Sequence, residues 1–579
     1  MKLNKYILMT SALLMGATGV FADDFDSFDD FGDFGGSSSS GSSSALEVNG
    51  SVTTDIRAYV DTSDKDDKDG ADKIDVSAIP SAKLDLKYSG NKSDLELKLK
   101  VDEDTVKNHP VDVIDEAVLR SYFDNLTLEA GKMKVVWGKG DKLHVLDNFN
   151  ADDYSDFIIP DYLDRRVSTP MVRAVLSLPF ANMNLEGVYT PFLPVDRFAT
   201  TGCWTPAQVL ELTDGVTSSA KKMVALSVER LEAARMEATE AEALQKLYAE
   251  NDAEAGKALT KMVTAAYASG KISYTSTEVG AKLVALGVNP LSATDEQKQQ
   301  AASAVLASKY PAYLKSELTA AETAYTLALA NANSLSANPD AIYPNMNTLK
   351  YSQFGGRATW TLGQVDMGLS YYNGFYKQPS FNGEKLGTFL TSYLANGEVA
   401  EEDKFLAYDR KQTFGLELSS IIWHFNVRGE FAYNLTEDKD GTDPWVHNNS
   451  VAWLGGFDID LPFWNANLNV QETGSYILNN DECDKHAADV DYDKTAYTNN
   501  KVVANVTTSF LNDKVAPEVT VMYGIERKDL VVMPKLAFKP DQNLTLTASG
   551  MYIHCADEES EFYAWRKNSF VNIGATYQF

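Results

Sequence analysis

The side chains best suited to binding a hard metal ion lie close together in one segment. Asp147, Asn150, Asp152 and Asp153 carry carboxylate and amide oxygens, the atoms that calcium prefers as ligands. The same side chains also cap turns by accepting hydrogen bonds from nearby backbone amides. We expect turn capping here, with a calcium-type site as the alternative.

Cysteine and histidine offer a second kind of metal chemistry. Cys483 and His486 share one polar segment, while His554 and Cys555 are neighbours in another, so the four are zinc-compatible if the segments meet. Two of the three cysteines, Cys203 being the third, could instead form a disulfide. We expect no bound metal and no cofactor, and the cysteine pairing stays open.

Catalytic chemistry has little support. The six histidines are scattered along the chain. Neither a Gly-x-Ser-x-Gly elbow nor the paired histidines of metalloproteases occurs. We therefore expect no enzyme, although a lipase that assembles Ser and His from neighbouring strands would leave no local motif.

Ten charged side chains share a position on the polar side of segments in which apolar and polar residues alternate. If these segments are strands around a wet interior, the charges line it and create a field that selects solutes. The alternative is a solvated wall with no selective role. The ten are Arg57, Arg120, Arg173, Arg357, Arg428, Asp55, Glu96, Glu129, Glu417 and Glu430.

The alternation that positions these charges begins at Ala45. Leu46, Val48, Val52 and Ile56 share one face of residues 45–60, and polar residues occupy the other. A run of this length suits a tilted membrane strand. The pattern returns on both sides of a short turn in residues 82–101, with leucines on one face and charges on the other.

Later segments bring the count to about 18 strands, with 16 possible. Most connections are very short on one side and longer on the other, which is typical of an all-β transmembrane antiparallel β-barrel. No apolar run after the first residues is long enough to cross a bilayer as a helix. The segments lie near 115–125, 126–137, 170–180, 183–193, 352–363, 364–378, 411–423, 424–436, 449–463, 465–479, 499–511, 516–527, 530–540, 543–554 and 569–579.

The composition of the chain argues against one class of binding partner. A formal charge of -30 would repel phosphate backbones, so we expect no nucleic acid. The hydrophobic fraction of 44% suits a folded protein, and 28 Tyr with 26 Phe could form aromatic girdles at two membrane interfaces.

The first 44 residues contain a predicted export signal and a low-complexity tail. Residues 1–22 combine early lysines, an apolar run and Val20-Phe21-Ala22, which predicts a cleaved secretory signal peptide. Residues 23–44 follow as an acidic tail with regularly spaced phenylalanines and a flexible Gly/Ser linker. This tail could order on a periplasmic partner, pack into the barrel mouth, or stay solvated without a partner.

The last nine residues alternate and end on an aromatic residue. Val571 to Phe579 looks like the assembly signal of bacterial outer-membrane β-barrels, with Tyr577 and Phe579 as its aromatic positions. The resemblance implies outer-membrane lipid and the barrel assembly machinery as partners, in a Gram-negative-type envelope. We expect this strand to close the barrel against the one near Leu46.

Residues 203–350 break the β pattern. Thr205-Pro206 provides a helix start, and the following Ala-, Glu-, Lys- and Leu-rich stretches predict an amphipathic helical bundle or hairpin. It should emerge on the long-loop, extracellular side, either projecting outward or folding inward as a plug. Residues 45–202 and 351–579 then form the two parts of the barrel.

One segment resembles a particular group of proteins. Gly131 to Gly138 reads Gly-x-x-x-x-x-Trp-Gly, and the loop after it carries Asp147, Asn150 and Asp153. This arrangement resembles an uncharacterised group of bacterial outer-membrane proteins, which implies a porin-like barrel but no substrate.

We therefore predict an outer-membrane, porin-like channel for passive diffusion of small hydrophilic solutes, lined by Arg and Asp/Glu and modulated by the helical insertion. The alternative is a surface adhesin or interaction protein, with the barrel as anchor and the insertion as binding domain.

Overall fold

The computed structural model describes residues 45–60, 75–141, 143–493 and 496–579. The predicted signal peptide and the acidic tail with its linker lie outside these residues. The chain divides into two compact units. The barrel unit consists of the described parts of Met1–Leu212 with Pro344–Asn382 and Leu406–Phe579, and the helical unit consists of Thr213–Tyr343 and Gly383–Phe405.

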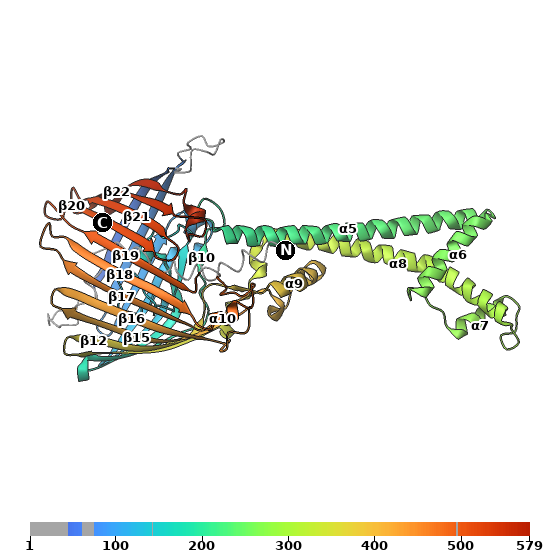
Figure 1. Cartoon of the computed structure of the whole chain (residues 1–579), viewed down its shortest axis with the longest axis horizontal. Coiled ribbons are helices and arrows are strands. Elements are labelled where there is room, and N and C mark those ends of the chain that lie inside the picture. The colour runs from blue at the N-terminus through green and yellow to red at the C-terminus, as the bar shows by residue number, and fades with distance from the viewer. Residues whose placement is uncertain (1–44, 61–74, 142, 494–495) are drawn as a thin grey trace. The chain divides into compact units, whose positions relative to one another are not determined.

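The barrel unit is one antiparallel sheet of 18 strands that closes on itself (Figure 1). Each strand pairs with its neighbour in the sequence, and the first pairs with the last, which confirms the predicted fold class. The strands are β1 (Ala45–Tyr59), β2 (Asp75–Ser89), β3 (Ser93–Val101), β4 (Ile114–Phe123), β5 (Leu126–Met133), β8 (Thr169–Leu178), β9 (Met183–Thr190), β11 (Gln353–Leu362), β12 (Val365–Phe375), β15 (Arg410–Ile422), β16 (Phe425–Thr436), β17 (Ser450–Asp460), β18 (Asn467–Ile477), β19 (Thr498–Thr507), β20 (Val515–Gly524), β21 (Asp529–Phe538), β22 (Leu544–Cys555) and β23 (Phe570–Gln578).

Alternation along the strands separates an apolar outer face from a polar inner one. Leu46 and Ile56 on β1 are 62% and 52% exposed, whereas Arg57 beside them is 5% exposed. Successive side chains of a strand point to opposite faces, so one face of the closed sheet carries the exposed aliphatic residues. The other face carries the charges and surrounds the interior.

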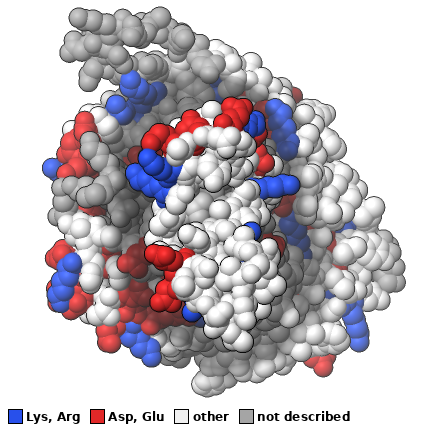
Figure 2. Space-filling model, turned by 90° about the vertical axis from the view of Figure 1, so that its right-hand side faces the viewer, with Lys and Arg blue, Asp and Glu red and all other residues white. Residues whose placement is uncertain are grey.

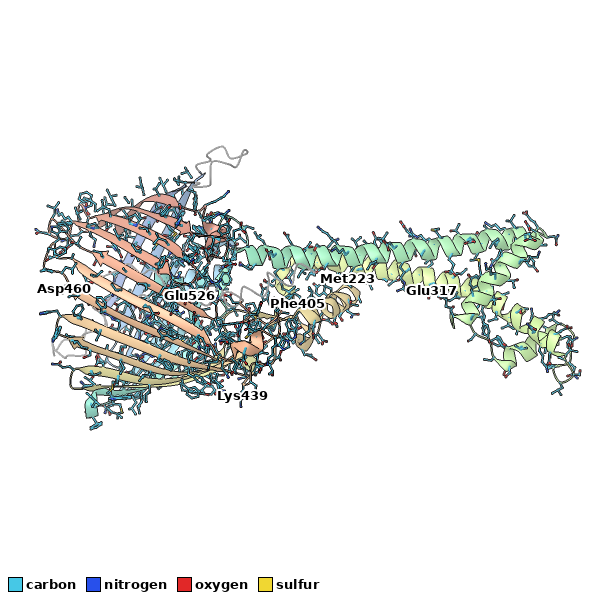
Figure 3. All side chains as sticks on the ribbon, viewed as in Figure 1. Met223, Glu317, Phe405, Lys439, Asp460 and Glu526 are labelled. Atoms are coloured by element: carbon cyan, nitrogen blue, oxygen red, sulfur yellow. The ribbon has the colours of Figure 1, made fainter. Side chains whose placement is uncertain are left out.

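Connections differ between the two ends of the barrel. At one end they are short, as at Gly363, whose positive φ of 65° supplies the turn between β11 and β12. Longer loops occupy the other end. Figure 3 shows Asp460 at the short-turn end, with Lys439 and Glu526 at the long-loop end. The link between β20 and β21 is short although it lies at the long-loop end.

The longer loops contain small elements of their own. A sheet of β10, β6 and β7 and a ladder of β13 with β14 form within them. Their bounds are α3 (Glu103–Lys107), η2 (Pro110–Val113), β6 (Ala151–Tyr154), α4 (Tyr162–Arg165), β7 (Arg166–Val167), β10 (Arg197–Phe198), η5 (Leu349–Tyr351), β13 (Ser380–Phe381), β14 (Leu406–Ala407), α10 (Asn480–Cys483) and η7 (Tyr563–Trp565), with η3 (Phe180–Asn182) in a short turn.

Helices dominate the second unit. They are α5 (Ala207–Ala249), which begins just before the unit, α6 (Ala253–Ala268), α7 (Ser276–Ala285), α8 (Asp295–Ala337) and α9 (Gly383–Asn396), with η4 (Pro339–Ile342) and η6 (Glu401–Asp403). Capping boxes start α7 at Thr275 and α8 at Thr294. Val263, Leu306 and Tyr310 contribute to a buried apolar core. None of the described helices combines the length and the apolar character that a membrane span requires.

Helix α9 belongs to the helical unit but comes from a different loop of the barrel. Asn331 on α8 donates to the Leu394 carbonyl at 3.0 Å, and Phe389 packs edge-on against Phe405 at 4.9 Å. Two loops of the barrel unit therefore supply one helical body.

The two ends of the described chain meet at the seam between β1 and β23. Gly50 and Phe579 exchange two backbone hydrogen bonds of 2.9 Å, and a Cβ on Gly50 would lie 2.6 Å from Cζ of Phe579. Gly50→Leu displaces this ring, so we expect it to destabilise the β1–β23 seam by roughly 1–3 kcal/mol. The temperature at which the fast-migrating folded band disappears from a gel measures the effect.

Gly187→Leu is the matched control, because nothing lies within 4 Å of a Cβ at that strand position. Equal melting temperatures for the two variants would contradict a stabilising role for the contact. Identical migration of boiled and unboiled wild-type protein would count against the barrel itself.

Candidate functional site

A single loop, residues 134–168 between β5 and β8, crosses the interior of the barrel. Arg57 on β1 binds Asp156 of this loop at 2.6 Å, and Lys83 on β2 binds Asp164 at 2.7 Å. The same loop reaches Glu430 on β16, which is far from β1 and β2 around the closed sheet. A segment that touches distant strands of one barrel runs through its inside, and we call it the inner loop.

Apolar side chains fill the spaces between the inner loop and the wall. Trp137 packs edge-on against Phe149 at 5.0 Å, and Phe149 packs edge-on against Tyr372 on β12 at 5.2 Å. Phe157 belongs to a second buried cluster that includes Met522 on β20. The inner loop thus packs against the wall like a core and occupies part of the interior.

One buried carboxylate fixes the bend of the inner loop. Oε1 of Glu430 accepts hydrogen bonds from the backbone amides of Lys139 and Gly140, both at 2.7 Å. Oε2 accepts from the amide of Val145 at 2.8 Å, and His144 Nδ1 lies 3.1 Å from Oε1. Hydrogen bonds to a charged acceptor in a buried site are the strong ones.

The predicted oxygen cluster of the inner loop is engaged by protein groups. Arg166 pairs with Asp147 at 2.7 Å and Asp152 at 3.0 Å. Asn150 accepts from the Val135 amide at 2.8 Å and donates to the carbonyls of Met133 and Val167.

The fourth oxygen donor, Asp153, caps a turn by accepting from the Ser155 amide at 2.9 Å. The cluster therefore holds the loop through ion pairs and backbone hydrogen bonds. Among the residues that the structure describes, no group of three or more His, Cys, Asp or Glu is arranged to hold a metal ion.

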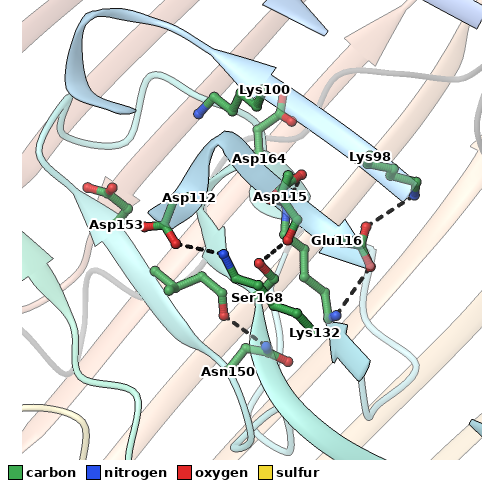
Figure 4. A network of polar contacts seen from close by, with 12 residues as sticks. Lys98, Lys100, Asp112, Asp115, Glu116, Lys132, Asn150, Asp153, Asp164 and Ser168 are labelled. Carbon is green, nitrogen blue, oxygen red and sulfur yellow. Dashed lines mark hydrogen bonds and ion pairs between the residues drawn. The ribbon is translucent and has the colours of Figure 1, made fainter. Parts of the chain in front are cut away.

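Polar contacts from neighbouring strands hold the two ends of the inner loop (Figure 4). Lys132 binds Asp112 at 2.7 Å, and Lys134 binds Asp115 at 3.0 Å. Ser168, where the loop returns to the sheet, donates to the Asp115 carbonyl.

Charged side chains of the inner wall form one continuous series of ion pairs, which we call the charge ladder. Arg120 bridges Glu96 and Glu129, Arg173 bridges Glu129 and Glu186, and Arg357 bridges Glu186 and Glu417. Lys98 extends the series by binding Glu96 at 3.2 Å and Glu116 at 3.1 Å. Positive and negative groups alternate along the ladder, so its local net charge stays low.

The ladder contains six of the ten predicted pore-lining residues: Arg120, Arg173, Arg357, Glu96, Glu129 and Glu417. The other four lie elsewhere on the wall. Arg57 and Glu430 hold the inner loop, Arg428 pairs with Asp141 and Asp458, and Asp55 accepts from Asn572 at 2.8 Å. That these residues line a conducting pore stays a prediction.

All three cysteines are among the described residues, and each is a free thiol. Cys483 accepts a hydrogen bond from Asn448 at 3.2 Å, and Cys555 lies 3.8 Å from Asp529. The weak zinc candidates Cys483, His486, His554 and Cys555 are not brought together as a metal site within the described chain.

Sequence reasoning missed that residues 134–168 enter the barrel. Leu143, Leu146, Phe149 and Ile158 are at most 1% exposed, and such an apolar content is unusual for a surface loop. This apolar content is the sequence signal that could have predicted a buried position for the loop. Sequence patterns also gave no sign of α9.

A buried histidine joins three of the long loops. Nδ1 of His447 lies 3.0 Å from Asp491, and the His447 amide donates to Asp409 at 2.9 Å. Asp489 accepts from the Asp491 amide, and the Tyr376 ring packs 4.4 Å from the imidazole. Burial lowers the pKa of His447, but Asp491 and Asp409 outweigh burial and leave it raised.

We expect the clamp around His447 to loosen as pH rises. Because the pKa of His447 is higher in the folded state than in the unfolded state, the protonated imidazole stabilises the folded loops. This stabilisation is complete below about pH 6.5, the unfolded-state pKa, and is lost as the pH rises through the folded-state pKa. Burial also raises the pKa of Asp409, and that of Asp489 to about 6, so both carboxyl groups also lose stability as pH rises. For Asp489 this loss falls mainly between its unfolded-state pKa, about 3.9, and its folded-state pKa, so His447 dominates between pH 6 and 8.5. Limited proteolysis of residues 437–449 and 478–497 should be faster at pH 8.5 than at pH 6.

His447→Gln should remove most of this pH dependence. His486→Gln, at an exposed position of the neighbouring loop, is the control and should retain it. A pH-independent cleavage rate in the wild type would refute the clamp.

Glu430→Gln should release the bend of the inner loop. The amide keeps the size of the side chain but replaces one charged acceptor by a donor, which costs roughly 2–4 kcal/mol at a buried site. Hydrogen–deuterium exchange of the amides at 139, 140 and 145 should accelerate. Glu472→Gln on β18 removes the same charge from a half-buried position and should leave this exchange unchanged.

Neither protein-family models nor curated proteins match this chain. Among solved structures, OccK11 (OpdR) of Pseudomonas aeruginosa is 7% identical, with a TM-score of 0.39, over 92% of this chain and 96% of that one. OccAB3 of Acinetobacter baumannii is 8% identical, with a TM-score of 0.38, over 92% and 99%. A BenF-like porin of Pseudomonas fluorescens is 7% identical, with a TM-score of 0.38, over 92% and 98%. These values mark a distant likeness, so the fold assignment rests on the strand pairing itself.

Proposed function

We propose that this protein is a porin-like channel of the bacterial outer membrane through which small hydrophilic solutes diffuse passively. The observation that carries the proposal is the inner loop, a segment with apolar and charged residues that is anchored across a closed barrel by Arg57, Lys83 and Glu430. A loop that narrows a wet interior without being a separate domain suits a diffusion channel with a size limit.

The outer face supports the membrane setting. Aliphatic side chains such as Leu46, Leu369 and Ile573 are more than half exposed, which is costly in water and favourable in lipid. Phe579 pairs through its backbone with Gly50 at the seam, as a terminal assembly strand would. We propose Tyr577 and Phe579 as the signal read by the barrel assembly machinery after export through the signal peptide.

The charge ladder supports passage of hydrated solutes. Each of its arginines has carboxylate partners, so the wall is polar without a large excess of either sign. We propose that it forms part of the lining, together with the remaining predicted residues, and that the helical insertion modulates entry. The proposal includes no catalytic step.

A second candidate function is surface interaction, with the barrel as an anchor. The observation that favours it is the helical unit, which has its own apolar core around Tyr310 and draws segments from two loops. Such a body could bind a molecule of another cell or of the host.

Planar-bilayer recordings separate the two functions. We expect ohmic openings from purified full-length protein, and openings of altered size or frequency when Thr213–Tyr343 is replaced by a short Gly/Ser linker. The fast-migrating band on an unboiled gel checks that each barrel is folded. Folded barrels that stay silent with and without the helices would leave the anchor function standing.

A further inference from the structure

Two lysines meet at the junction between the inner loop and the wall. Lys377 follows β12, and Lys411 is the second residue of β15. Their ammonium groups lie 5.8 and 6.0 Å from the ring centroid of the same residue, Tyr372, which is buried. The fold therefore brings two lysine side chains to one aromatic ring.

The partners of both ammonium groups are neutral. Lys377 donates to Oε1 of Gln353 at 2.6 Å and more weakly to the Phe149 carbonyl and the Tyr372 hydroxyl. Lys411 donates to Oδ1 of Asn148 at 2.7 Å. Over the described part of the chain, no carboxylate lies within 4.0 Å of either ammonium.

This arrangement contrasts with the rest of the inner wall. Arg120, Arg173 and Arg357 each bind two carboxylates, in a chain whose net charge is -30. Acidic partners are therefore abundant, yet the two lysines are held by amides and a carbonyl. Placing like charges together away from water costs free energy that a bound anion would offset.

Electrostatics and exposure agree with this geometry. Burial, and then the charge of Lys411, lower the pKa of Lys377 well below its usual value, and burial lowers the pKa of Lys411 to about 8. The carboxylates of Asp196, which faces both lysines, and of Asp147, which faces Lys377, act in the opposite direction but do not outweigh burial. Over the whole residue, both lysines are half-buried. Asn148 and Phe149 of the inner loop border the site, which places it beside the narrowed interior.

We propose that Lys377 and Lys411 form a binding subsite for small oxyanions along the path through the barrel. The oxygens of a carboxylate or phosphate group accept hydrogen bonds from both ammonium groups. The amides of Gln353 and Asn148 hold the two lysines in position. The subsite rests on the proposed channel function, because it gives the solutes a chemical class.

Isothermal titration of detergent-solubilised full-length protein tests the subsite with succinate and inorganic phosphate as separate probes. We expect saturable binding of at least one probe at low ionic strength. Lys377→Gln and Lys411→Gln should each weaken it by tenfold or more. Lys439→Gln, at an exposed position of another loop, removes the same charge and should bind like the wild type.

A proton count distinguishes binding at these lysines from adsorption elsewhere. An anion favours the charged ammonium, so titrations at pH 8 in buffers of different ionisation enthalpy should show proton uptake. Lys377→Gln should reduce this uptake, and folded-band migration checks that each variant is intact.

The two probes assign the source of the oxyanion. Binding of succinate alone identifies carboxylates, and binding of phosphate alone identifies phosphates. Failure of the folded wild type to bind either probe would overturn the subsite whatever the variants do. Openings in the bilayer together with such a failure would leave the channel function intact, while binding by a silent barrel would refute the channel and retain the subsite.

Discussion

Closure of the sheet is the constraint on which the rest of the structure depends. Residues 51–59 of β1 pair with residues 570–578 of β23, so the first and last strands leave no unpaired edge. In lipid an unpaired backbone group has no water to bind, and closure is the only way for a sheet to satisfy every strand. Because closure pairs the first strand with the last, every strand between them must pair with its neighbours in the correct register.

Closure also creates an inside, and the inside determines where charge can lie. Alternation sends every second side chain inward, where Arg120, Arg173 and Arg357 find carboxylates on neighbouring strands. The inner loop uses the same space. Its backbone amides bind Glu430, and its aromatic residues pack on the wall. Polar pairing and apolar packing thus share the interior.

The strands were predictable because their signal is local. Each alternating segment, such as residues 45–60 or 569–579, carries its own period-two pattern, and turns such as the one at Gly363 are short enough to recognise. The ion-pair partners of the inward-facing charged side chains were harder to predict from the sequence. Arg428 and Glu430 sit two residues apart on β16, yet Arg428 binds two carboxylates, Asp458 on β17 and Asp141 of the inner loop, while Glu430 binds backbone amides of that loop.

The sequence by itself determined the fold class, the approximate number of strands, the polar side of the alternating segments and the helical character of the insertion, because periodicity and composition act over short stretches of chain. Only the tertiary structure decided that residues 134–168 enter the barrel, that α9 joins the helices of another loop, and that Lys377 and Lys411 meet at Tyr372. These contacts join residues far apart in the chain, and no local pattern encodes which distant surfaces become neighbours once the barrel closes.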